Sequence, residues 1–185
     1  TEAYGVLNVM LDEDPDLLES PEFRTVLGVT NILMRRFDEG AKLLVHKSLI
    51  AEQDTFLWSA VAHSELGNHE IALAQYENGA DILSLQYPQD QIRCMLVAIR
   101  SAFALKKFDF IESALSILEK LPLNAAQLTE VDYWHALLER ENGNLLKAEE
   151  ILKSIVKAGV RETASWAKLD LINMDYQNKK IDGTE

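Results

Sequence analysis

The 185-residue chain has a single cysteine, Cys94, which excludes an intrachain disulfide and cysteine-based zinc clusters. Its glycines occur singly rather than in a phosphate-binding loop. No apolar run approaches the ~18 residues that a membrane-spanning helix needs. Because the chain begins at Thr1 without a signal peptide, we expect any targeting segment to lie elsewhere, and the compartment stays open between cytoplasm and periplasm.

Basic residues are scarce. Lysine and arginine total 18 against 30 aspartates and glutamates, which gives a net charge of −12. Since a phosphate backbone requires a basic surface, we expect no nucleic-acid partner. An acidic surface fits a basic partner, and more commonly it serves solubility. A hydrophobic content of 48% is normal for a globular chain and is sufficient for a core.

Groups that carry out chemistry are also few and scattered. None of the four histidines, His46, His63, His69 and His135, is paired at the i, i+4 spacing of a helical zinc site. Cys94 lies in an apolar run, which indicates an inert core thiol rather than a nucleophile. We therefore expect no enzyme activity, no metal and no cofactor.

Residues 54–88 read as two short amphipathic helices joined by a tight turn at Gly67-Asn68. Small residues at Ala60, Ala72 and Gly79 mark places where two helix axes approach closely. The apolar faces are predicted to carry Leu57, Val61 and Leu66 in the first helix and Ile71, Tyr76, Leu83 and Leu85 in the second. Such a hairpin needs a similar neighbour to cover its flanks.

A second copy of this layout occurs 76 residues later. Trp134, Ala136, Gly143 and Ala148 repeat the spacing of Trp58, Ala60, Gly67 and Ala72. The interval leaves room for one more unit of the same size. A fixed period of about 20–50 residues is typical of a solenoid.

The remaining chain also reads as helix, with no alternating pattern that indicates a strand. Ser20 with Pro21 begins a helix, Asn124 or Thr129 caps a later one, and Gly159 ends another. The predicted organisation is a second helix over 1–15, helical hairpins over 21–52, 53–88, 89–122 and 124–159, and a first helix over 162–178.

These small residues and turns resemble the tetratricopeptide repeat (TPR), a 34-residue helix–turn–helix with small residues at its eighth, twentieth and twenty-seventh positions. Ala60, Ala72 and Gly79 match these positions, and Leu27-Gly28 matches the family's Leu-Gly pair. The turns are spaced at 32, 39, 37 and about 36 residues, which leaves a related helical-hairpin family open. The third unit fits least well, since Ile111 stands where alanine is usual.

The resemblance implies an all-α fold: a single right-handed α-solenoid over residues 1–185, with about ten antiparallel helices. It also implies an internal part of a longer repeat protein, because the first and last helices lack their hairpin partners. The alternative is that these two helices are natural caps.

In the resembling family, the first helix of each hairpin lines a concave groove that binds a partner. Here the groove positions lack the Lys and Asn residues of a carboxylate clamp, so we expect an apolar peptide or amphipathic helix as ligand. Arg100 and Phe103, with Leu96 and Tyr133, form its predicted centre. The alternatives are that Phe103 belongs to the core, that Arg100 pairs with an acidic neighbour, and that several apolar residues pack between repeats. The complete predicted groove comprises Val29, Ile32, Leu33, Leu57, Val61, Arg93, Leu96, Arg100, Phe103, Tyr133, Leu137 and Arg140.

The sequence therefore favours a non-catalytic scaffold for protein–protein interaction. The alternative is an assembly module that self-associates or continues a longer superhelix. A regulatory domain of an attached enzyme is a third hypothesis.

Overall fold

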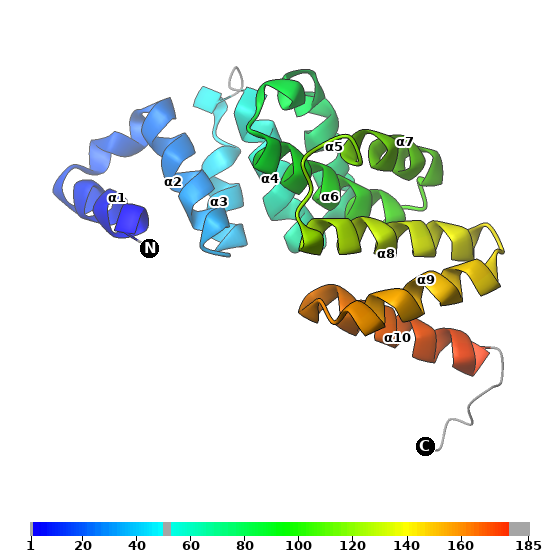
Figure 1. Ribbon diagram of the computed structural model, residues 1–185. Coiled ribbons are helices and arrows are strands. Elements are labelled where there is room, and N and C mark those ends of the chain that lie inside the picture. The colour runs from blue at the N-terminus through cyan, green and yellow to red at the C-terminus, as the bar shows by residue number, and fades with distance from the viewer. Residues whose placement is uncertain (1, 50–52, 178–185) are drawn as a thin grey trace. The chain divides into compact units, whose positions relative to one another are not determined.

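The computed structural model describes residues 2–49 and 53–177, and within them it contains helices and no strand (Figure 1). This confirms the all-α class and the predicted number of about ten helices. The α-helices are α1 Glu2–Glu13, α2 Pro21–Leu33, α3 Phe37–Leu44, α4 Gln53–Glu65, α5 His69–Gly79, α6 Pro88–Ala104, α7 Phe108–Leu118, α8 Ala125–Glu141, α9 Leu145–Ala158 and α10 Arg161–Gln177. Short 3₁₀ helices follow α1, α3 and α5: η1 Pro15–Glu19, η2 Lys47–Leu49 and η3 Ala80–Leu85.

The chain divides into two compact units, Thr1–Ala114 and Leu115–Glu185, with the division inside α7. In the first unit, α2 packs on α3, α4 packs on α5, and α6 contacts both α4 and α5. In the second unit, α9 packs between α8 and α10, and α10 also contacts α8. A single solenoid across both units stays a prediction.

Four turns between consecutive helices have the same backbone geometry. The residues with positive φ are Arg35 (62°), Gly67 (76°), Lys106 (58°) and Gly143 (83°), whose separations match the predicted turn spacings of 32, 39 and 37 residues. At each turn this residue donates a hydrogen bond to the carbonyl three residues earlier, and the next residue donates to the carbonyl five residues earlier. In the second hairpin these bonds join Gly67 to Ser64 at 3.1 Å and Asn68 to His63 at 2.9 Å. This pair of bonds is the Schellman helix end, which satisfies carbonyls left open by the last helical turn. The turn predicted about 36 residues after Gly143 lies outside the described residues.

Small residues lie where the helices of a hairpin approach closely, as predicted. A Cβ added at Gly79 would lie 2.8 Å from Leu57 Cγ, and one at Gly28 would lie 2.7 Å from Leu44 Cδ2. Ala60 and Ala72 are each 1% exposed. In these two hairpins, close contact between the helices leaves room only for side chains of this size.

Three residues expected on apolar faces are instead exposed: Leu66 (40%), Ile71 (47%) and Leu85 (79%). The physical reason is where the helices end. Helix α4 ends at Glu65, so Leu66 belongs to the turn. Helix α5 ends at Gly79 and a 3₁₀ helix follows, which changes the face on which Leu85 lies. Ile71 is in the first turn of α5, before the buried Ala72 and Leu73.

The helix starts follow the predicted capping residues. Ser20 Oγ accepts a hydrogen bond from Phe23 N at 3.2 Å, with Pro21 as the first residue of α2. Asn124 is the cap of α8 and forms a capping box with Gln127. The alternative cap, Thr129, donates its hydroxyl to Ala125 O inside the helix. Gly159 ends α9 in the left-handed conformation. In the first predicted segment, α1 has no buried residue.

Candidate partner-binding surfaces

The first helices of neighbouring hairpins contact one another, so their outer sides form a surface within each unit. In the first unit these helices are α2, α4 and α6, and in the second they are α8 and α10. The predicted groove residues lie on these helices. The α4–α6 surface belongs to the first unit and the α8–α10 surface to the second.

Many of the predicted groove residues are already covered by packing. Leu57 is 1% exposed, with its side chain against Gly79 of α5, and Val61 is 4% exposed. Ser64 Oγ of α4 donates to Val97 O at 3.2 Å where α6 packs on α4. The other buried members are Ile32, Leu96, Tyr133 and Leu137. Packing between adjacent repeats was the alternative prediction for Leu57, Val61 and Leu137. The contact of Leu57 with Gly79 lies within its own hairpin.

The other members keep surface available to a partner. Leu33 is exposed at 54%. The remaining five, Val29, Arg93, Arg100, Phe103 and Arg140, are half-buried. A partner that approaches the first helices would therefore meet arginines and aromatic edges more than aliphatic side chains.

On the α4–α6 surface, Arg93 stacks on Trp58. Its guanidinium carbon lies 5.2 Å from the ring centroid, a cation–π distance. Arg93 also donates to Asp90 at 3.3 Å, and its side chain remains 41% exposed. The indole thus fixes the position of a cation that solvent reaches.

Further along the same surface, Arg100 pairs with Glu65 at 2.7 Å, with 31% and 25% of the two side chains exposed. The ring of Phe103 meets that of Phe108 edge to face at 6.0 Å. Beneath them, Ser101 donates to Ser64 at 3.0 Å and lies 3.3 Å from His69 Nδ1. These contacts hold Arg100 and Phe103 in place. They agree with the alternative predictions that Arg100 pairs with an acidic neighbour and that Phe103 belongs to the core.

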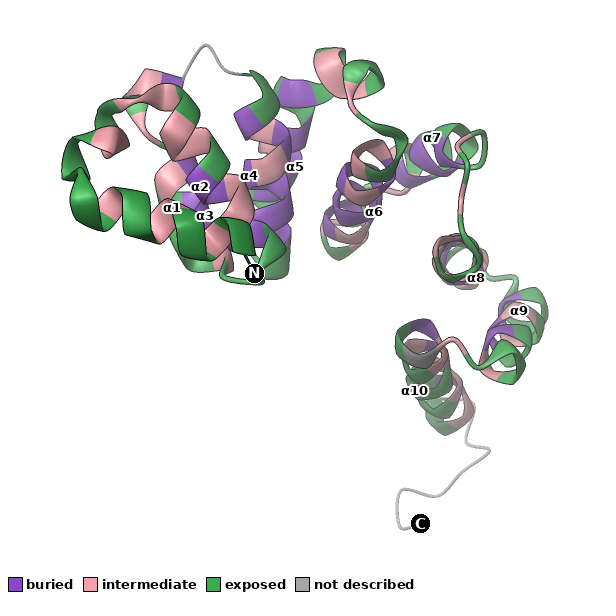
Figure 2. Ribbon diagram, turned by 60° about the vertical axis from the view of Figure 1, so that its left-hand side comes forward, coloured by how far each residue is buried: buried purple, intermediate pink, exposed green. Residues whose placement is uncertain are grey.

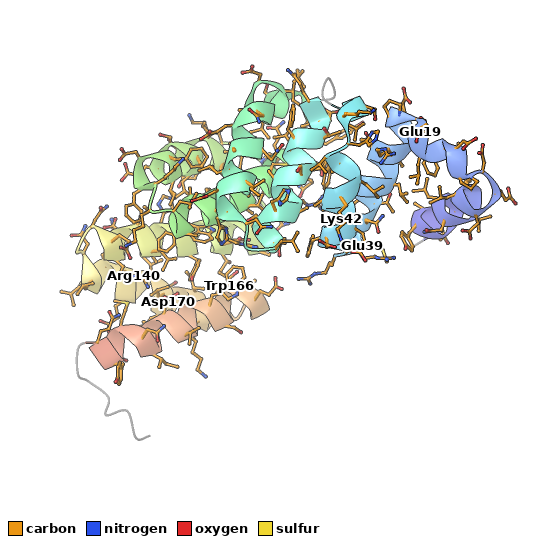
Figure 3. The ribbon with its side chains drawn as sticks, turned by 180° about the vertical axis from the view of Figure 1, so that it is seen from behind. Glu19, Glu39, Lys42, Arg140, Trp166 and Asp170 are labelled. Atoms are coloured by element: carbon orange, nitrogen blue, oxygen red, sulfur yellow. The ribbon has the colours of Figure 1, made fainter. Side chains whose placement is uncertain are left out.

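On the α8–α10 surface, Asp170 connects two of the predicted residues (Figure 3). Its carboxylate accepts from Arg140 at 2.7 Å and from the Tyr133 hydroxyl at 2.7 Å. The Tyr133 ring lies 5.7 Å from that of Trp166. The Arg140 and Asp170 side chains are 22% and 17% exposed. The result is a charged pair bordered by two aromatic rings.

Sequence reasoning did not include Asp170 and Trp166 in the groove. Continuing the repeat count into the last helix would have placed Trp166 on the first-helix side. The pairing of Arg140 with Asp170 has no local signal, because the two residues are thirty positions apart.

The histidines and Cys94 lie apart from one another, and His46 and His135 contact nearby side chains. His46 Nδ1 lies 2.9 Å from Ser48 Oγ, and His135 Nε2 lies 2.7 Å from Glu119. Burial lowers the pKa of His63, and burial raises the pKa of Cys94 to about 12. Among residues 2–49 and 53–177, no group of three or more His, Cys, Asp and Glu side chains could hold a metal ion. No helix in this described part is long and apolar enough to cross a membrane.

Two open hollows lie at hairpin turns rather than on the two surfaces. One of about 290 Å³ is bordered by residues 67–71 and Leu105, and one of about 600 Å³ by Glu139 and residues 143–147. Both are shallow depressions formed by backbone turns.

No protein-family model, curated protein or solved structure matches this chain.

Proposed function

We propose that the chain is a non-catalytic protein–protein interaction scaffold, a TPR-like right-handed solenoid that binds a peptide or amphipathic helix on its first helices. The observation that carries this proposal is the four equivalent Schellman turns at Arg35, Gly67, Lys106 and Gly143. Repetition of one turn presents successive first helices in an equivalent way, and extended binding surfaces are the usual use of such repetition.

The α8–α10 surface supplies the best-defined contact site. Trp, Tyr and Arg are the side chains that most often dominate binding energy at protein interfaces. Here Asp170 already orients Arg140, and Tyr133 already packs against Trp166. Because these side chains lose little further rotamer freedom when a partner binds, the entropic cost of association is reduced.

The proposed ligand is an amphipathic helix that places an apolar side chain against Trp166 and an acidic or carbonyl oxygen against Arg140. Arg140 donates to Asp170 through Nη1 and to Glu141 through Nε and Nη2, which leaves one N–H on each terminal nitrogen for a ligand oxygen. Arg93 on Trp58 offers the same combination of cation and aromatic ring on the α4–α6 surface.

The experiment is a displayed library of random 16-residue peptides selected on the wild-type chain, followed by calorimetry of the enriched peptides. We expect 1:1 binding that weakens at least about tenfold in Trp166→Ala and in Arg140→Ala, which is typical of interface hot spots. Lys153→Ala is the matched control, because Lys153 forms an exposed ion pair with Glu149 on the second helix α9.

Circular dichroism of each variant must show an intact fold. Enriched peptides that bind Trp166→Ala and Arg140→Ala as tightly as the wild type would exclude the α8–α10 surface. A selection that yields no 1:1 binder would contradict the proposed scaffold function itself.

Assembly through a terminal helix is a second candidate, since Leu169, Ile172 and Tyr176 of α10 are exposed.

A further inference from the structure

Helix α10 has an apolar stripe that no described element covers. Leu169 is 60% exposed, Ile172 47% and Tyr176 61%. The opposite side of the helix carries the buried Thr163 and Met174, which face α8 and α9. Exposed residues accordingly run along much of α10 (Figure 2). Single exposed apolar side chains are common, but three in line along one helix form a contact surface.

The spacing of the stripe is that of a coiled-coil seam. Leu169, Ile172 and Tyr176 are separated by three and then four residues, which are successive a and d positions of a heptad. One flank of this seam carries Lys168 and Asp175. The other flank carries Trp166 and Asn173, neither of which is charged.

The charges on the first flank indicate which helix fits the seam. When two such helices pair antiparallel, equivalent flanks face each other, so Lys168 meets the partner's Asp175 and Asp175 meets the partner's Lys168. In a parallel pair, Lys168 would instead face the uncharged Asn173 of the other copy. Opposite charges therefore match twice in the antiparallel arrangement and not in the parallel one.

The two charged residues differ in their present contacts. Lys168 is exposed and forms no ion pair within the described residues. Asp175 is half-buried and already interacts within the chain, so an incoming lysine would share its carboxylate with that contact.

We propose that α10 is a self-association surface that pairs antiparallel with α10 of a second copy, with Leu169, Ile172 and Tyr176 in the seam and two reciprocal Lys168–Asp175 ion pairs on one flank. This inference goes beyond peptide binding on the first helices, and sedimentation of the chain without peptide tests it separately. The two surfaces adjoin, because Trp166 borders the seam and also contacts Tyr133 of α8.

The dimer is expected to be weak and reversible. Three apolar side chains from each copy correspond to the low end of interface sizes, below about 1,200 Å² in total. The net charge of −12 on each copy opposes association, although salt at physiological concentration screens this repulsion beyond about 8 Å. Measurements must therefore extend to protein concentrations of about 1 mM.

The test is sedimentation equilibrium of the whole chain over a concentration series. The wild type is expected to form a concentration-dependent dimer, and Ile172→Glu is expected to remain monomeric. Lys168→Asp and Asp175→Lys should each weaken the dimer about two- to tenfold, since each places like charges opposite one another twice. The double swap, which carries both substitutions, should return to within about twofold of wild-type affinity.

Leu146→Glu is the matched control, because Leu146 is 84% exposed elsewhere in the second unit and should leave the dimer unchanged. Thermal melts must confirm that every variant folds. The proposal is overturned by a wild type that stays monomeric, by a dimer that persists in Ile172→Glu, or by a double swap that fails to restore association. Loss of the dimer in Val6→Glu, on the exposed side of α1, would show that another surface makes the contact.

Discussion

The four hairpin turns predict how substitutions at the turn change the free energy of unfolding. The sign of the change depends on the φ angle of the substituted residue. Arg35 and Lys106 are non-glycine residues with φ of 62° and 58°, whereas Gly67 and Gly143 occupy the equivalent positions with φ of 76° and 83°. The left-handed region costs an L-residue about 1–2 kcal/mol, while glycine adopts it freely. Lys106→Gly should therefore stabilise the chain and Gly143→Ala should destabilise it.

The magnitude follows from two opposing terms. Lys106→Gly removes the left-handed penalty of about 1–2 kcal/mol, but it also gives the unfolded chain more freedom, which costs about 0.4–1 kcal/mol. The net stabilisation is about 0.5–1 kcal/mol. Gly143→Ala reverses both terms, and a Cβ there would meet nothing within 4 Å, so no steric contribution is added. In a chain of this length the melting temperature should shift by roughly 1–4 °C in each direction.

The assay is urea unfolding followed by circular dichroism at 222 nm, with a separate transition fitted for each unit where the curve shows two. Lys107→Gly is the matched control: it changes the same residue type one position later, where φ is not positive, and should lower the urea midpoint. If Lys106→Gly lowers the midpoint as much as Lys107→Gly, the turn does not hold its left-handed residue and the equivalence of the four turns is refuted.

Three further changes test packing, the α8–α10 network and pH dependence. Ala72→Leu should destabilise by about 1–3 kcal/mol through overpacking, whereas Ala74→Leu on the exposed side of α5 should leave the thermal melt nearly unchanged. Asp170→Ala should cost about 1–3 kcal/mol in urea unfolding because Tyr133 loses its acceptor and Arg140 keeps only Glu141, and Asp170→Asn should recover part of this loss. Burial raises the pKa of Cys94 to about 12. Since the unfolded thiol releases its proton near pH 9 while the folded thiol keeps it, stability should fall as the pH rises from 9 toward 12, and the urea midpoint of Cys94→Ala should fall less steeply over that range.

The backbone of the hairpins was predictable because its signals are local. A glycine at a turn and small residues on either side depend on distances of a few residues along the chain, and Gly67, Ala60 and Ala72 lie where these signals placed them. The capping residue Ser20 is local in the same sense. These features fixed helix type and turn position without knowledge of tertiary packing.

The surfaces were less predictable because burial depends on which helix comes to lie on which. Leu57 was a predicted groove residue, yet its side chain packs against Gly79 of α5 and is 1% exposed. Asp170 was absent from the predicted set because its partners, Tyr133 and Arg140, come from a different helix. The sequence pattern of α8 does not indicate that a neighbouring helix places a carboxylate beside Tyr133 and Arg140.

The third hairpin shows that distance from the turn predicts the burial of a residue better than its type does. Counted from the residue with positive φ, position −7 is occupied by Gly28, Ala60, Ile99 and Ala136, and position +5 by Gly40, Ala72, Ile111 and Ala148. All eight residues are buried, including the two isoleucines at 0% exposure. Burial at these positions therefore follows from the geometry of the turn, while the size of the side chain varies between hairpins.

The irregular turn spacing comes mainly from helix length. Eight residues lie between the hairpins in both the 32-residue and the 39-residue interval, but α3 has 8 residues and α4 has 13, against 11 in α5 and 17 in α6. The link becomes short later in the chain, where only Gly159 and Val160 separate α9 from α10. A repeat that varies in helix length but not in its turns keeps each first helix in the same register relative to its own hairpin. This is the property that a surface made of successive first helices requires.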